Sequence, residues 1–374
     1  MIGTRGVPAS YGGFETAVEE VGRRLVDAGQ RVVVYSRGER GPKTSQGMER
    51  VWLPAVRRKQ LETLSHTGLS VVHTVAKVRP DVAFVFNAAN APFLPALRAT
   101  GVPIAVHVDG LEWKRGKWGS FGRRYYRWAE HTSARWADAL IADAPGIADY
   151  YRDEFDVPTE LIRYGAKIIE DAPTDGVEGL GLRPGGYHLV VARFEPENHV
   201  LEIVEGYRRS AARMPLVVVG SAPYAAEYTQ RVDAAAAGDD RIRLLGGVYD
   251  QDLLDALYHH AATYVHGHSV GGTNPSLLRA IGAGTFVIAY DVGFNTEIVG
   301  DNGLFFTSGD DVVRAVESAE ADPGRLVTAG EALRKDAESR FDWDEVAARY
   351  LDLSRRLCDS ERSRAPGRVT RRSR

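Results

Sequence analysis

Residues 263–290 have the types and spacing of a phosphate-binding loop. An apolar run leads into a glycine-rich stretch, and Asn274-Pro275 then open a helix. Asparagine is a good N-cap and proline fits the first helical position, so the free N–H groups and the positive end of the helix dipole would face an anion over the loop. Gly271 and Gly272 have no side chains, so a ligand can approach their backbone closely. The predicted phosphate-binding residues are Gly271, Gly272, Thr273, Asn274 and Ser276.

Arg193 places a cation at the end of another strand. It follows the apolar run 187–192. Its planar guanidinium donates two hydrogen bonds at once, which suits a diphosphate. The alternative is a surface arginine that pairs with Glu195 or Glu197. We expect Arg193 to face an anionic ligand.

A second glycine-rich loop, at residues 3–13, lies near the N-terminus. It does not spell G-x-G-x-x-G, and no P-loop motif occurs in the chain, which argues against a dinucleotide dehydrogenase. We expect the N–H groups of Gly12 and Gly13 to contact a pyrophosphate or a sugar, because Arg5 and Glu15 flank them. The alternative is a simple turn between strand and helix.

His107 and Asp109 end an apolar strand and point in the same direction, toward the ligand end of a parallel sheet. We expect both to contact a ligand at that end, as polar contacts for a group that the protein would transfer. The alternative is that His107 is a core histidine. His266 and His268 have the spacing of two metal ligands, but no third ligand is close in sequence. We therefore predict no metal site.

Residues 113–128 combine six Lys or Arg with six aromatic residues and no acid. This mixture favours an anionic membrane surface, since aromatic rings settle at the headgroup level and cations meet acidic lipid. The alternative is a helix with rings inward and charges outward. Nucleic acid is not expected as a partner. The chain has a net charge of −3, and residues 361–374 carry six Arg against one Glu, so the rest of the chain is acidic. A general nucleic-acid binder would instead have a broad basic surface.

The chain of 374 residues is long enough for two domains, and apolar runs alternate with helical periodicity throughout. We predict two Rossmann-like α/β domains, residues 1–170 and 171–358, followed by a disordered basic tail at 359–374. Only Met1 and Ile2 precede the first glycine turn, so either the first strand is truncated or the true start lies upstream, and we favour the second. One cysteine, no long apolar run and no signal-peptide pattern suggest a cytoplasmic protein.

Five sequence blocks together closely resemble the bacterial rhamnosyltransferase branch of retaining glycosyltransferase family 4. The resemblance covers about residues 1–355. The blocks are GTRGVPASYGGFET at 3–16, DGLEWKR at 109–115, ADAPGI at 142–147, RFEPEN at 193–198 and HGHSVGGTNPS at 266–276.

The resemblance implies a GT-B fold, in which two Rossmann domains face each other across a cleft, with the sugar-nucleotide donor mainly on the C-terminal domain and the acceptor mainly on the N-terminal one. It implies no metal and no cofactor. Arg193, the loop with its helix start, and Gly12-Gly13 would stabilise the leaving diphosphate. Asp109 and Glu112 would orient sugar and acceptor, and Val248 and Tyr249 would border the base.

The chain departs from the family pattern at three positions. Many members have Glu-x7-Glu across the donor loop, where this chain has Gly271 and Arg279. The second glutamate is thought to grip the ribose, so Arg279 would remove an acceptor and pair with a phosphate instead. Asn198 stands where many relatives have a lysine, which leaves more of the diphosphate charge to Arg193.

The resemblance implies a peripheral enzyme on the inner face of the plasma membrane. It would move a sugar, rhamnose from dTDP-rhamnose, onto a polyprenyl-diphosphate-linked saccharide in surface-polysaccharide biosynthesis. Two alternatives stay open. One is a catalytically impaired homologue that binds a nucleotide sugar or a partner, and the other is a sugar-nucleotide epimerase.

Overall fold

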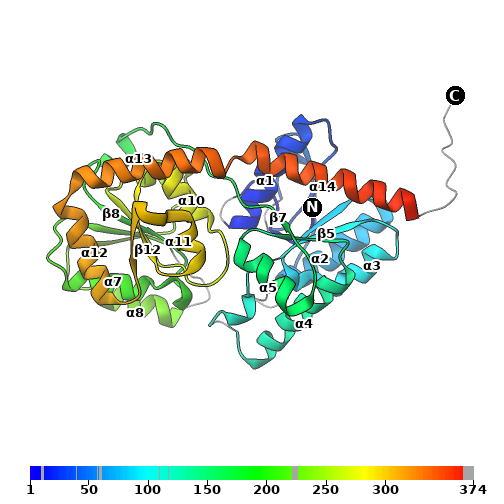
Figure 1. The fold of residues 1–374 in the computed structure, drawn as a ribbon, viewed down its shortest axis with the longest axis horizontal. Coiled ribbons are helices and arrows are strands. Elements are labelled where there is room, and N and C mark those ends of the chain that lie inside the picture. Colours follow the sequence, from blue (N-terminus) through cyan, green and yellow to red (C-terminus); the bar gives the residue numbers. More distant parts are fainter. Residues whose placement is uncertain are drawn as a thin grey trace. The chain divides into compact units, whose positions relative to one another are not determined.

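The computed structural model describes residues 1–9, 12–38, 40–56, 58, 61–108, 110–116, 118–220 and 226–364, with side chains to residue 360. Its contacts group the chain into two units (Figure 1). The first comprises Met1–Asp109, Ser120–Arg163 and Trp343–Arg374, and the second comprises Gly110–Gly119 and Tyr164–Asp342.

The strands of the first unit are short. The four at residues 33–36, 83–86, 104–107 and 139–142 are almost entirely buried, as expected of a parallel sheet covered on both faces, whereas the strands at residues 44–45, 48–52 and 160–161 are mostly only partly buried. They are β1 (Val33–Ser36), β2 (Thr44–Ser45), β3 (Met48–Trp52), β4 (Ala83–Phe86), β5 (Ile104–His107), β6 (Ala139–Ala142) and β7 (Glu160–Leu161). They pair in the orders β1-β3-β2 and β4-β5-β6-β7, and the pairing is parallel except at β2.

Met1 and Ile2 lie between these two groups of strands. The backbone N–H of Tyr35 in β1 donates to the carbonyl of Met1, at 3.3 Å, and Ile2 forms a parallel bridge with Val85 of β4. The two residues thus occupy the place of a first strand, as their position before the glycine turn predicts.

The helices of the first unit pack on this sheet. They are α1 (Gly13–Asp27), α2 (Glu62–His73), the π-helical turn η1 (Thr74–Val78), the 3-10 turn η2 (Ala88–Phe93), α3 (Leu94–Arg98), α4 (Ser120–Trp136), α5 (Pro145–Phe155) and α14 (Trp343–Arg364). Ile2, Val85, Val106 and Leu140 are members of its core.

The last helix, α14, belongs to the first unit, which differs from the predicted division at residues 170 and 358. The reason is a buried contact: the hydroxyl of Tyr350 lies 2.7 Å from Nδ1 of His107, and its ring packs 5.1 Å from that of Phe84. The helix also continues to Arg364, so residues 359–364 are helical and not the disordered tail that was predicted. The remainder of that tail lies outside the described residues.

The second unit is a six-stranded parallel sheet in the order β10-β9-β8-β11-β12-β13. Numbered along this half of the chain, the order is 3-2-1-4-5-6, that of a Rossmann fold, and the strand order reverses between β8 and β11. The strands are β8 (His188–Val191), β9 (Leu216–Val219), β10 (Ile242–Gly246), β11 (Thr263–His266), β12 (Phe286–Tyr290) and β13 (Gly303–Phe306).

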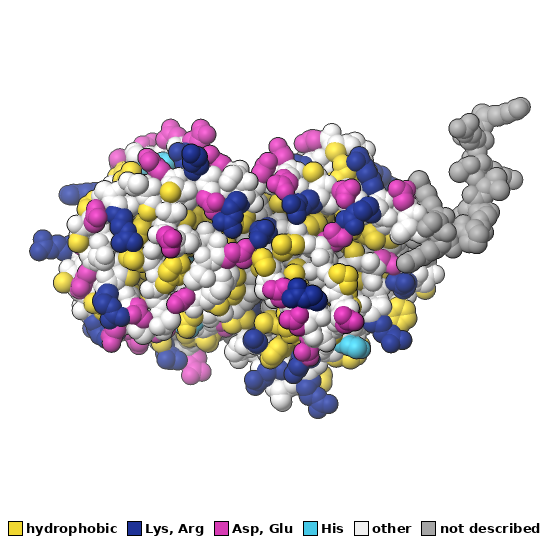
Figure 2. All heavy atoms as spheres, in the orientation of Figure 1, with side chains coloured by type: hydrophobic (Ala, Val, Ile, Leu, Met, Phe, Trp, Pro, Cys, Tyr) yellow, Lys and Arg dark blue, Asp and Glu magenta, His cyan; other side chains and the backbone are white. Residues whose placement is uncertain are grey.

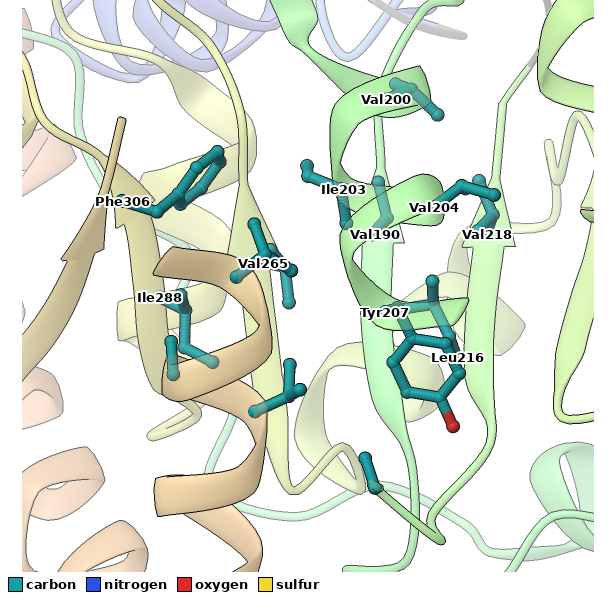
Figure 3. Close-up of a cluster of buried hydrophobic side chains, with 14 of the residues drawn as sticks. Val190, Val200, Ile203, Val204, Tyr207, Leu216, Val218, Val265, Ile288 and Phe306 are labelled. Atoms are coloured by element: carbon teal, nitrogen blue, oxygen red, sulfur yellow. The ribbon is translucent and has the colours of Figure 1, made fainter. Parts of the chain in front are cut away.

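Helices cover this sheet, and its core is shown in Figure 3. Val190, Val218, Val265 and Ile288 on the strands belong to the same buried cluster as Tyr207 of the helix α7. The helices and 3-10 turns of this unit are η3 (Glu112–Lys114), α6 (Asp175–Gly179), η4 (Pro196–Asn198), α7 (Val200–Arg209), α8 (Ala226–Ala236), α9 (Gln251–His259), α10 (Pro275–Gly282), α11 (Gly293–Val299), η5 (Gly300–Asn302), α12 (Gly309–Ala321) and α13 (Pro323–Arg340). The predicted two-domain α/β class is confirmed.

Candidate functional site

The loop between β11 and α10 has the local structure that its sequence predicts. Asn274 is the N-cap of α10, and its side-chain oxygen accepts a hydrogen bond of 2.8 Å from the N–H of Ser276. Pro275 occupies the first turn. Gly271 has φ +132°, a conformation that favours glycine. The first turn of α10 follows directly on this glycine loop, which is the geometry that binds anions.

Arg193 lies in the loop after β8, and β8 is hydrogen-bonded to β11. Its side chain is 50% exposed, with Nη2 3.6 Å from the carboxylate of Glu195. Both loops thus begin at the carboxyl ends of neighbouring strands, at the point where the strand order reverses and ligands bind in such sheets. The ion pair with Glu195 is the one that the surface interpretation expects, and half of the side-chain surface of Arg193 remains accessible.

Asn198 ties these two loops together. Its Nδ2 donates a hydrogen bond of 2.8 Å to the carbonyl of Arg193, and its Oδ1 lies 2.8 Å from Nδ1 of His268. Burial holds the pKa of His268 well below its usual value, and the positive charges of Arg115 and Arg193 lower it further. His268 is therefore neutral near pH 7 and acts as a hydrogen-bonding group between the loops.

The other histidine of the pair, His266, is 3% exposed, and its Nδ1 lies 3.1 Å from the hydroxyl of Tyr264. Burial lowers its pKa to about 3. Within the described part of the chain, no group of three His, Cys, Asp or Glu side chains is placed to hold a metal ion.

The segment Gly110–Gly119 packs within the second unit, although it lies between β5 and α4 in sequence. A Cβ on Gly110 would lie only 2.5 Å from the carbonyl carbon of Gly271, so the two backbones touch. Glu112 is 5% exposed and forms an ion pair with Arg115. The structure thus brings the segment that carries Glu112 to the loop before α10, whereas Asp109 lies outside the described residues.

Arg279 projects from α10 toward α9. Its Nε donates to Asp255 at 2.8 Å, and its Nη1 donates to the side chain of Gln251 at 3.0 Å. Lys167 also pairs with Asp255. These contacts give Arg279 a structural role between two helices, and its contact with a phosphate stays a prediction.

Val248 and Tyr249 lie in the loop between β10 and α9, just before the N-cap Asp250. Tyr249 is 61% exposed. The loop leaves the carboxyl end of β10, on the ligand edge of the sheet. Their contact with a base stays a prediction.

The predicted residues of the first unit lie at two places. Gly12 has φ +106° and precedes α1, Gly13 begins that helix, and the carboxylate of Glu15 accepts a hydrogen bond of 2.9 Å from the N–H of Arg5. His107, by contrast, is 2% exposed, and burial lowers its pKa to about 3. It lies in the core as the alternative interpretation expects, with its Nδ1 2.7 Å from the hydroxyl of Tyr350.

Sequence reasoning missed two residues of this neighbourhood. Arg115 and Glu197 are both nearly buried, with 10% and 3% of their side chains exposed, and lie 3.9 Å apart. Arg115 had been assigned to the aromatic and basic segment, and Glu197 to a surface ion pair. Residues 113–128 contain no acid, and nothing in the sequence indicates that the carboxylate near Arg115 comes from Glu197, far along the chain.

Two family models match the chain. Residues 12–165 match a glycosyl transferase 4-like domain, and residues 186–322 match the glycosyl transferases group 1 family. Together the two matches cover more than half of the chain, which belongs to the glycosyltransferases with a GT-B fold.

Curated relatives are similar over part of the chain. The O-antigen chain mannosyltransferase B of Escherichia coli is 25% identical over 179 residues, which are 46% of this chain and 46% of the relative. The chain therefore spans about half the length of that protein. The alpha-maltose-1-phosphate synthase of Mycolicibacterium smegmatis is 25% identical over 69% of this chain and 74% of its own.

Solved structures share the fold over nearly the whole chain. Sucrose-phosphate synthase from Thermosynechococcus elongatus matches with a TM-score of 0.79 and 20% identity, over 93% of this chain and 94% of that one. HepE of Anabaena, solved in complex with UDP and glucose, matches with a TM-score of 0.75 and 17% identity, over 93% and 97%. At these identities the likeness establishes the GT-B fold.

Proposed function

We propose that the protein transfers a sugar from a nucleoside diphosphate to an acceptor hydroxyl with retention of configuration. One observation carries the proposal. The loop with Arg193 and the loop that leads into α10 follow the neighbouring strands β8 and β11, at the point where the strand order reverses. A diphosphate there would meet a guanidinium and free N–H groups together. Structures of similar fold include complexes with UDP and with UDP-2-fluoro glucose.

In the proposed reaction the bond between sugar C1 and the diphosphate oxygen breaks through an oxocarbenium-like state. The acceptor oxygen bonds to C1 on the same face, and its proton passes to the departing diphosphate. The protein's contribution is to position the reactants and to stabilise the negative charge that develops on the leaving group. Arg193 and the first turn of α10 would do so without a metal.

We take rhamnose from dTDP-rhamnose as the donor, on the resemblance of the five sequence blocks, and a polyprenyl-diphosphate-linked saccharide as the acceptor. Such an acceptor requires a protein that works at a membrane surface. The chain has no helix, over its described ranges, with the length and hydropathy that a bilayer crossing needs.

Helix α4 carries the surface that we assign to an anionic membrane. Phe121 and Trp128 are 84% and 49% exposed, whereas Tyr126 is buried, so rings point both outward and inward. Arg123 and Arg124 are exposed. Figure 2 shows Lys and Arg side chains gathered over this helix, at the lower edge of the view. An exposed ring among cations suits a headgroup layer.

Helix α2 also exposes apolar side chains. Leu69 and Val72 of α2 are 44% and 66% exposed, and both α2 and α4 pack on η2. Replacing Phe121 and Trp128 by serine should abolish co-flotation with phosphatidylglycerol vesicles and leave nucleotide binding intact. Equal flotation of wild type and variant would remove the membrane from the proposal.

The proposed transfer is tested with purified protein, a panel of nucleotide sugars and lipid-linked acceptors. The expected result is nucleoside diphosphate release that requires both dTDP-rhamnose and acceptor, with a product that retains the anomeric configuration. Nucleotide binding without turnover on any pair would establish the catalytically impaired alternative, which is favoured by the engagement of Arg279 with Asp255. Release of an epimerised sugar nucleotide without acceptor would establish the epimerase.

A further inference from the structure

The segment Gly110–Gly119 is built into the donor side of the second unit. The backbone contact between Gly110 and Gly271 leaves no room for a side chain at residue 110, because an added Cβ would meet three backbone atoms of Gly271 at 2.5 to 2.8 Å. The segment is therefore fixed against the loop that precedes α10. Whatever side chains it carries inward become part of that loop's surroundings.

Arg115 is one of the side chains that the segment carries inward, together with Glu112. It is 10% exposed and is held by the carboxylate of Glu112, with Nη1 3.9 Å from Oε1 of Glu197. A Cβ on Gly271 would lie 3.9 Å from Nη2 of Arg115 and 3.1 Å from Nε2 of His268. The guanidinium and the imidazole of His268 thus both lie next to Gly271.

Two polar side chains near Arg115, those of Asn198 and His268, carry no positive charge. Asn198 is a neutral amide bonded to the carbonyl of Arg193 and to His268. The pKa of His268 is held low by burial first and then by Arg115 and Arg193. His268 and the guanidinium of Arg115 both lie beside Gly271, and Asn198 joins His268 to the backbone of Arg193, so the loops that carry Arg193 and Gly271 meet next to Arg115.

Glu197 fixes the guanidinium from the other side. Its side chain is 3% exposed, and neither carboxylate oxygen has a hydrogen-bond partner in the described part of the chain. A buried carboxylate is costly unless a positive charge lies nearby. Glu112 and Glu197 hold Arg115 in place, and a guanidinium has five donors, enough to serve these carboxylates and a phosphate together.

We propose that Arg115 is a donor-binding residue whose guanidinium contacts the diphosphate beside Gly271, opposite Arg193. The inference rests on the proposed function. It assigns the diphosphate a cation from a segment that the sequence places in the first half of the chain. It also assigns Glu112 the role of a positioning residue for Arg115.

The test compares binding of dTDP and thymidine to wild type and Arg115→Gln by calorimetry. A hydrogen bond between charged groups is lost, so dTDP affinity should fall about tenfold to a hundredfold while weak thymidine binding stays unchanged. The matched control is Arg241→Gln, since Arg241 is also partly buried and paired with a carboxylate, Asp239, but lies at the opposite end of the sheet's strands. The control should bind dTDP as wild type does.

Unchanged dTDP affinity in folded Arg115→Gln, or an equal loss for dTDP and thymidine, would overturn the inference and leave the proposed function standing. If Arg115→Gln does not fold, Arg115→Lys replaces it. Lysine keeps the positive charge but not the planar guanidinium with its two parallel donors, so dTDP affinity should still fall, and affinity equal to that of wild type would overturn the guanidinium contact. Failure of the wild type to bind dTDP or UDP would overturn both proposals together.

Discussion

The two units each place a glycine-rich loop before a helix, and the two loops differ in charge. At the start of α1, Gly12 offers no side-chain cap, and the carboxylates of Glu15 and Glu19 accept hydrogen bonds from the N–H groups of Arg5 and Ala9. At the start of α10, a neutral asparagine is the cap. The first loop thus has protein carboxylates bonded to its backbone N–H groups, whereas the helix after the second loop is capped by a neutral amide.

This difference separates two kinds of recognition. A carboxylate repels a phosphate but accepts hydrogen bonds from sugar hydroxyls, whereas free N–H groups and a guanidinium favour phosphate. The same local sequence pattern, glycines between a strand and a helix, therefore suits opposite ligands according to which charged residues flank it.

Arg193→Ala is expected to have the largest effect. Loss of a cation that stabilises the leaving group should reduce transfer about 100-fold to 1,000-fold. Thermal stability should change little, since the side chain is 50% exposed. Arg209→Ala is the control, because that side chain is 54% exposed and also pairs with a carboxylate, Asp310. Turnover of Arg193→Ala within a few fold of the control would contradict the assignment of the second loop to the diphosphate.

The helix caps, the strands and the Rossmann character of both halves could be predicted from the sequence because each depends on neighbours in the chain. Asn274 as N-cap is such a local feature. The placement of α14 and of Gly110–Gly119 could not, since it depends on which core an apolar face meets. The helical pattern that includes Tyr350 is the same whichever sheet the helix packs on, so the sequence does not assign α14 to one unit.

The short hairpin β2–β3 was also missed, for a related reason. Its second strand contains Glu49 and Arg50 and lacks an apolar run. It forms because β1 offers an unpaired parallel edge, with Val33 opposite Glu49. Tertiary pairing overrides the local pattern there, as strand propensities often allow.

Buried histidines in both units predict acid sensitivity. The pKa of His107 in the first unit and that of His266 in the second are each lowered by burial to about 3. Their unfolded values lie near 6.5, so the unfolded state binds more protons between pH 6.5 and 3, and stability falls as pH falls through that range. Each such histidine should remove about 2 kcal/mol of unfolding free energy between pH 7 and 5.

Urea unfolding at several pH values measures this dependence. His107→Gln, neutral at every pH, should flatten the decline even if its stability at pH 7 is lower. His131→Gln should leave the decline unchanged, since His131 is exposed. An identical pH dependence in His107→Gln and wild type would show that His107 binds a proton as readily in the folded protein as in the unfolded chain.

Asn274→Asp gives the second loop the negative charge that the first already has. Aspartate caps a helix as well as asparagine does, so the melting temperature should stay close to that of wild type. Affinity for dTDP should fall roughly tenfold, because a carboxylate then lies beside the bound diphosphate. Asp322→Asn at the N-cap of α13 makes the reverse exchange at a cap outside this loop and should leave affinity unchanged. Equal affinity in Asn274→Asp would mean that the diphosphate does not lie over α10.

Glu15→Gln should have the smallest effect on the nucleotide. If the first loop serves hydroxyl groups, removing its negative charge should leave dTDP affinity within about twofold of wild type, while the KM for acceptor rises. The amide still accepts the hydrogen bond from the N–H of Arg5, which preserves the loop. Glu20→Gln on the same helix is the control, since Glu20 pairs with Arg23 and Arg24 away from the loop. A clear gain in dTDP affinity in Glu15→Gln alone would show that the first loop also meets the diphosphate, and the contrast between the two loops would then be one of degree.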